Sequence, residues 1–175
     1  DEDEEVDREV REMIKRLEEH VKRDEDTLEE MLKRLRDHVE RDRRRLEELL
    51  KDLERLVRER GRDEELEKKV KKIIRENREN LKRLEERVEK IRRDNEKNNE
   101  DLRREVEDIR KKLRDKVDDK EELKRLDREA EELLRRVDRL NEEVEKKLRK
   151  LLEEVRRENK RLEEEAKRLL DKAEE

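Results

Sequence analysis

Cysteine, serine, proline and aromatic residues are all absent from this sequence, and Gly61 is its only glycine. The lack of serine and cysteine removes the usual side-chain nucleophiles, and a single glycine excludes a glycine-rich phosphate loop. Nucleic-acid bases would find no aromatic ring to stack on, and basic residues are interleaved with acidic ones instead of forming a basic stripe. No apolar run approaches the ~20 residues that a membrane-spanning helix needs. We therefore expect no enzyme activity, no nucleic-acid partner and no membrane partner.

The composition is dominated by charge, with 67% charged and 27% hydrophobic residues. Such a composition often indicates disorder, but here the net charge is only −5 and the apolar residues recur at helical spacing. A stripe of two apolar positions in every seven is ~29% apolar, which is close to the observed fraction. Each helix is therefore predicted to carry one narrow apolar seam. With nothing apolar left for a second interface, we expect a monomer that requires no partner.

One stretch occurs twice, eighteen residues apart, and contains both histidines of the chain. Its copies are Val10, Met13, Ile14, Leu17, His20, Val21, Asp24 and Leu28, Met31, Leu32, Leu35, His38, Val39, Asp42. Eighteen residues make about five helical turns, so both copies present the same face. Similar repeats follow within residues 66–98 and 126–159. A repeat of seven residues imposes left-handed supercoiling and a repeat of eleven residues imposes right-handed supercoiling. Eighteen residues over five turns, ~3.6 residues per turn, lies between the two and predicts nearly straight helices.

The apolar seams indicate three long helices, at about residues 3–60, 63–117 and 119–174. Connections of two or three residues force neighbouring helices to run antiparallel. The predicted fold class is all-α: a single-chain antiparallel up-down-up three-helix bundle, forming one domain over residues 1–175.

Capping residues support these boundaries. Asp3 and Asp63 are suitable N-caps, and Gly61 suits the left-handed residue that commonly follows a helix. At the third helix a capping-box pattern can be read in two registers: Asp119 with Glu122, or Asp118 with Glu121.

Ten polar residues fall within or beside the seams when residues are placed ~100° apart around each helix. In a pair of antiparallel helices, the residue numbers of any two facing residues have the same sum. The pairs Asn95 with Asn141 and Asn77 with Asn159 share one such sum, so both pairs are predicted to face each other. The same rule matches these residues with the polar residues of the first helix. The predicted polar layers are His20, Asp24, Asn95, Asn98 and Asn141, and His38, Asp42, Asn77, Asn80 and Asn159.

Buried polar groups cost free energy unless they are partnered, and five complementary groups can form a connected hydrogen-bond network. One interpretation is that the layers specify helix register and topology, because slipped helices leave polar groups unpaired. The alternative is a pH-responsive bundle or assembly building block that is switched by protonation of His20 and His38. An interaction module is a third possibility, for which the sequence offers no apolar patch.

No metal or cofactor is expected. Neither histidine belongs to a Glu-x-x-His or His-Glu-x-x-His pattern, and one histidine per layer with amides is a poor zinc site. The acidic start at Asp1–Glu5 is the opposite of a basic secretory signal, and the lack of cysteine leaves the redox compartment open.

The layer repeat, the His/Asn/Asp layers, the aliphatic seams, the Glu/Lys/Arg surface and the minimal turns at Gly61 and Asp118-Asp119 resemble a known class of protein. This class is de novo designed, parametrically generated helical bundles with buried hydrogen-bond networks. The resemblance covers the whole chain. It lies in the composition and the repeat pattern and does not involve a specific sequence motif. It implies a synthetic, soluble scaffold without natural activity, cytoplasmic in an expression host and otherwise of unknown location. A natural spectrin-like repeat fits less well, because the helices are too long and aromatic core residues are missing.

Overall fold

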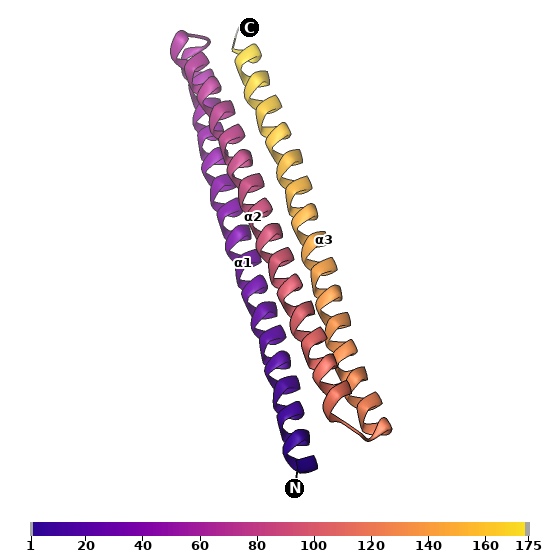
Figure 1. Cartoon of the computed structure of the whole chain (residues 1–175). Coiled ribbons are helices and arrows are strands. Elements are labelled where there is room, and N and C mark those ends of the chain that lie inside the picture. The colour runs from indigo at the N-terminus through magenta and orange to yellow at the C-terminus, as the bar shows by residue number, and fades with distance from the viewer. Residues whose placement is uncertain (1, 174–175) are drawn as a thin grey trace. The chain divides into compact units, whose positions relative to one another are not determined.

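The computed structural model describes residues 2–173, and their side chains from Glu4 onward. Three helices account for nearly all of this range: α1 (Glu2–Arg60), α2 (Glu64–Lys116) and α3 (Lys120–Lys172). They pack against one another without any strand in the described range, which confirms the predicted all-α three-helix bundle (Figure 1). The capping role predicted for the Asp3 side chain lies outside the described side chains.

The chain divides into two compact units, each built from a segment of all three helices. The first unit contains Asp1–Met31 and Ile91–Lys146, and the second contains Leu32–Lys90 and Lys147–Glu175. The single domain over residues 1–175 and the nearly straight course of the helices stay predictions.

Each unit has its own apolar cluster, formed by seam residues of the three helices. In the first unit the buried members are Val10, Ile14, Leu17, Val21, Leu102, Val106, Ile109, Leu113, Val117, Leu126, Ala130, Leu133 and Val137. In the second they are Leu46, Leu50, Leu53, Leu56, Leu66, Val70, Ile73, Leu162, Ala166 and Leu169. Three- and four-residue spacing keeps these side chains on one face, so a narrow stripe on each helix is enough to fill each cluster.

Ion pairs between the helices show the antiparallel arrangement within the first unit. Lys116 Nζ of α2 lies 3.0 Å from Glu9 Oε2 of α1, so the end of α2 lies beside the start of α1. The pair Arg103–Asp138, at 2.8 Å, joins α2 to α3.

The second unit repeats this arrangement. Arg45 of α1 lies 3.4 Å from Glu76 of α2, and Arg78 of α2 lies 3.2 Å from Glu163 of α3. In both units α2 therefore runs opposite to the segments that it contacts.

The two turns use the expected residues. Gly61 has a φ of 70°, in the left-handed region, and its N–H donates to Val57 O at 3.3 Å, which closes the end of α1. Asp63 Oδ1 accepts a hydrogen bond of 2.8 Å from the Leu66 N–H, which confirms Asp63 as an N-cap. At the second turn Asp119 Oδ1 accepts from the Glu121 N–H at 3.0 Å, so the cap is formed by Asp119 and not by Asp118.

Replacing Gly61 with alanine is expected to lower the free energy of unfolding by about 1–2 kcal/mol, because a left-handed backbone disfavours a Cβ atom. Steric crowding is not the cause, since the nearest atom to an added Cβ is Ala173 O at 3.8 Å. The measurement is urea unfolding followed by circular dichroism. Gly61→Asn is the matched control and should lose less, because asparagine tolerates this conformation; equal losses in both variants would contradict the explanation.

Candidate functional site

The five residues of the first predicted layer all lie in the first unit, and all are partly buried. Asn95 Nδ2 of α2 donates to Asn141 Oδ1 of α3 at 3.0 Å. This is the amide pair that the numbering predicted, and it joins two helices inside their apolar seams.

His20 forms a second polar contact in this layer, between α1 and α2. Its Nδ1 lies 3.1 Å from Glu105 Oε2, and its Nε2 lies 3.6 Å from Asp24 Oδ2. The His20 side chain is 33% exposed. No hydrogen bond in the described structure links His20 to the Asn95–Asn141 pair or engages Asn98, so the predicted connected layer is resolved into two separate contacts.

Glu105 was not among the predicted site residues. The antiparallel numbering matches His20 with Asn98, whereas in the structure its Nδ1 lies against Glu105, seven residues further along α2. Nothing in the sequence distinguishes Glu105 from the many other glutamates on the helix surfaces.

The second layer lies in the second unit and is centred on Asn77, which is fully buried. Asn77 Nδ2 donates to the backbone oxygen of Asn159 at 2.9 Å, and Asn159 Nδ2 donates to the backbone oxygen of Asn77 at 3.4 Å. The structure thus brings together the predicted pair, but through backbone acceptors instead of side-chain acceptors. The two amides hold α2 against α3 reciprocally.

His38 differs from its predicted burial, because its side chain is exposed. Asp42 and Asn80 are partly buried, and within residues 2–173 neither they nor His38 form a hydrogen bond or ion pair. The physical reason is the charge on α2: the residue eighteen positions before Glu105 is Arg87, so no carboxylate draws the ring of His38 inward. The predicted second network therefore reduces to the Asn77–Asn159 pair.

Two buried oxygen atoms of the layers accept no hydrogen bond: Asn77 Oδ1, and Asp24 Oδ2, which has only the 3.6 Å contact with His20 Nε2. A buried acceptor without a partner costs about 1–3 kcal/mol. The layers are thus placed at a local cost in stability, which is typical of residues that specify an arrangement rather than strengthen it.

Each layer also lies at the end of an apolar cluster. The cluster of the first unit ends at Val21, Leu102 and Val137, each of which lies within four residues of a layer residue on its helix. The cluster of the second unit begins next to its layer, with Leu46 on α1, Ile73 on α2 and Leu162 on α3.

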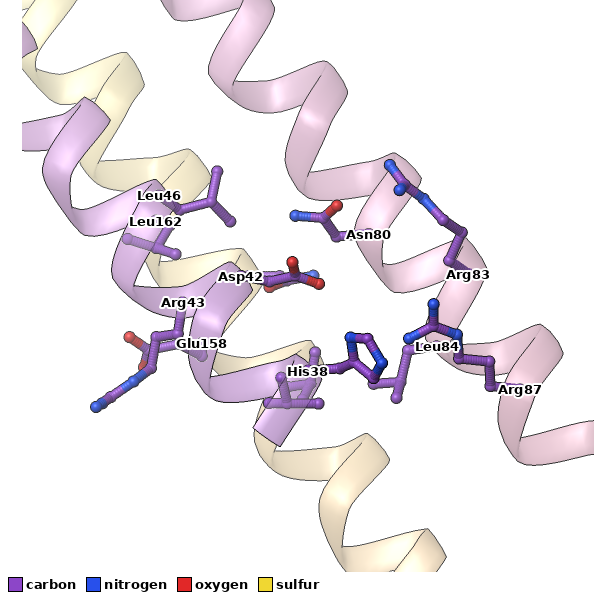
Figure 2. A pocket seen from close by; sticks show the side chains of 13 residues that line it. His38, Asp42, Arg43, Leu46, Asn80, Arg83, Leu84, Arg87, Glu158 and Leu162 are labelled. Carbon is purple, nitrogen blue, oxygen red and sulfur yellow. The ribbon is translucent and has the colours of Figure 1, made fainter. Parts of the chain in front are cut away.

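A cavity of about 280 Å³ lies beside the second layer, among α1, α2 and α3 of the second unit. Its apolar lining consists of Val39, Leu46, Leu84, Val155 and Leu162. Figure 2 shows His38 and Asp42 projecting from α1 toward α2, while Asn80 and Arg87 project from α2. The exposed ring of His38 places this side of the cavity at the protein surface.

Two other charged residues that line the cavity, Arg43 of α1 and Glu158 of α3, each have a partner on their own helix. Arg43 donates to Glu40 at 2.9 Å, which raises the pKa of Arg43 and lowers that of Glu40. Glu158 accepts from Arg161 at 2.6 Å, and this hydrogen bond holds the pKa of Glu158 below its ordinary value.

The described residues contain no group of three or more histidine, aspartate and glutamate side chains that could hold a metal ion. Within the same range, no helix combines the length and apolarity needed to cross a membrane. Comparisons of the chain with protein-family models, curated proteins and solved structures found no match.

Because its folded-state pKa is lowered, Glu158 contributes stability above its ordinary pKa and loses it as the pH falls through the lowered value. Glu158→Gln is expected to reduce the free energy of unfolding by about 0.5 kcal/mol at pH 7. The difference from the unmodified chain should disappear near pH 3.

The measurement is denaturant unfolding at both pH values. Glu153→Gln is the control, since Glu153 is an exposed acid of the same helix and has no ion pair in the described part of the chain. A difference for Glu158→Gln that is unchanged between pH 7 and pH 3 would rule out this linkage.

Proposed function

We propose that the chain is a de novo designed structural scaffold without natural activity, in which the two polar layers specify helix register and topology. The observation that carries the proposal is the asparagine pair between α2 and α3 in each unit, Asn95–Asn141 and Asn77–Asn159. Both pairs lie within seams that are otherwise aliphatic, so each one marks a single alignment of the two helices.

The energetic argument rests on what a slipped arrangement would lose. If α3 moved along α2 by one helical turn, Asn159 would face aliphatic residues and Asn77 would lose its only hydrogen bond while buried. An unpartnered buried amide costs about 1–3 kcal/mol, and a slip breaks both layers at once. Aliphatic contacts alone discriminate less, because the seams repeat every eighteen residues.

The surface supports a monomer as part of this proposal. Among residues 4–173, no large hydrophobic side chain is exposed. Stable association between copies normally requires a contiguous apolar area, and each helix has only the one seam that it uses within the bundle. The charged surface, with both signs interleaved, is typical of a chain that is kept soluble and free of partners.

A pH-responsive bundle is the second candidate, and the position of His20 bears on it. On protonation both ring nitrogens would be donors, facing Glu105 of α2 and Asp24 of α1. Within the described part of α3, no charged group forms a hydrogen bond or ion pair with the ring. A charged His20 ring would thus reinforce the contact between α1 and α2, and the ring of His38 is exposed and has no ion pair within residues 2–173. These contacts support the scaffold rather than a bundle that opens at low pH.

Replacing the paired asparagines by leucine tests the proposed role directly. In the variant Asn77→Leu/Asn95→Leu/Asn141→Leu/Asn159→Leu we expect the free energy of unfolding to stay equal or to rise by about 1–4 kcal/mol. At the same time the single species should give way to several, because register is no longer specified. Sedimentation velocity and the number of amide NMR signals measure this.

The control for that experiment is Thr27→Leu/Asn99→Leu, which adds aliphatic side chains outside the two layers. It should keep one species. If the layer variant also remained a single monomer with one set of signals, the layers would not be what fixes the arrangement.

Thermal melts at pH 7.5 and pH 4.5 separate the two candidate functions. For the scaffold, we expect the same change in melting temperature between the two pH values in the unmodified chain and in His20→Asn/His38→Asn. A pH-responsive bundle requires the change to shrink or vanish in the variant. The single variants then assign any response to the His20 cluster or to His38.

A further inference from the structure

The two units carry the same layer residues but opposite charges beside the histidine. On α2, the residues on the histidine side of the first layer are Asp101 and Glu105, and their equivalents eighteen positions earlier are Arg83 and Arg87. On α1, Glu25 of the first unit corresponds to Arg43 of the second. The repeat therefore preserves the aliphatic and amide positions and exchanges the charges that border them.

This exchange leaves three members of the second layer, His38, Asp42 and Asn80, without a partner within residues 2–173, while Asn77 and Asn159 pair with each other. In the first unit, His20 lies between Glu105 and Asp24, so an acidic residue of α2 forms a contact with the histidine. In the second unit, Arg83 and Arg87 are exposed and have no ion pair, and the Asp42 carboxylate has no partner anywhere in residues 2–173. Asp42 is nevertheless partly buried, where a charge is more costly than at the open surface.

The unpartnered groups surround the 280 Å³ cavity and are separated by sign. The carboxylate of Asp42 lies on α1, while both guanidinium groups lie on α2 together with the Asn80 amide. Figure 2 shows Arg87 extending from α2 toward the side of the cavity where His38 lies. The other two charged residues of the lining, Arg43 and Glu158, are already neutralised by Glu40 and Arg161.

We propose that this cavity binds a small zwitterion with an aliphatic side chain, of the chemical class of the α-amino acids. The ammonium group pairs with Asp42 and with the Asn80 oxygen, and the carboxylate pairs with Arg83 and Arg87. The aliphatic side chain packs on Leu46, Leu84 and Leu162, which line the same cavity. The volume suits a small molecule, since pockets for drug-sized ligands begin at ~300 Å³.

Ligands with a single charge fit less well. A simple carboxylate would be attracted by Arg83 and Arg87 but would leave Asp42 unpaired and close to a second negative charge. An alkylammonium would neutralise Asp42 but would lie near two guanidinium groups. Only a ligand with both charges satisfies each side of the cavity, and charge-assisted hydrogen bonds are stronger than neutral ones.

The test is NMR titration of the full chain, labelled with ¹⁵N, with L-leucine as the probe. We expect shifts confined to residues 38–46, 80–87 and 155–162, with a dissociation constant of about 1–10 mM, as befits a ligand of few atoms. 4-Methylpentanoate and 3-methylbutylamine, which each lack one of the two charges, should bind at least about fivefold more weakly. Equal binding of either compound would overturn the zwitterion, and no localised shift up to about 50 mM leucine would overturn the site.

The repeat supplies matched variants for this test. Asp42→Asn and Arg87→Gln should each weaken leucine binding at least about fivefold, whereas Asp24→Asn and Glu105→Gln, at the equivalent positions of the first unit, should leave it unchanged. Arg87 is exposed, so its replacement does not endanger folding. Leucine binding that is insensitive to Arg87→Gln, or that shifts residues 20–28 equally, would contradict the assignment.

Discussion

Each helix carries a single narrow apolar stripe, and that stripe must be buried against two neighbours at once. The buried aliphatic residues of these stripes include the two clusters and further seam residues such as Leu35, Leu84 and Leu148, and no large hydrophobic side chain is left exposed among the described ones. A polar residue placed in such a stripe is therefore forced into contact with another helix. For this reason the proposed control of alignment is assigned to four asparagines in a chain that is two-thirds charged, since exposed ion pairs contribute little.

The parts of the structure that follow from periodicity could be predicted from the sequence. The three-helix bundle, the left-handed turn at Gly61, the Asp63 cap and the facing of Asn95 with Asn141 all depend on residue spacing and on antiparallel numbering. The use of backbone acceptors by Asn77 and Asn159 could not be predicted, since the spacing gives the facing residues but not their rotamers. The exposure of His38 and the contact of His20 with Glu105 depend on charges of another helix, at the edge of the seam, where periodicity carries little information.

The comparison between the layers shows how much a repeat leaves undetermined. His20 and His38 have the same neighbours along α1, an aspartate four residues later and a valine directly after. One ring lies between two carboxylates and the other is exposed, because α2 presents Glu105 in one unit and Arg87 in the other. The local sequence thus determines where the side chain lies on its own helix. The charge on the facing helix determines whether that side chain forms a contact. The same holds for Asp24 and Asp42, of which only the first has a nearby histidine nitrogen.

The position of each polar layer at the end of an apolar cluster has a consequence for how the chain opens. In the second unit the cluster is bounded by the Gly61 turn at one end and by the Asn77–Asn159 pair at the other. Packing lost inside this cluster has to pass the polar pair before it reaches the other buried seam residues of the unit, such as Leu84 and Leu152, so we expect the pair to hinder its spread along the helices. The backbone amide hydrogens of each cluster would then exchange with solvent at rates that depend on the opening of that cluster. We therefore expect polar residues inside the seams, as well as turns, to limit how far cooperative unfolding extends in this fold.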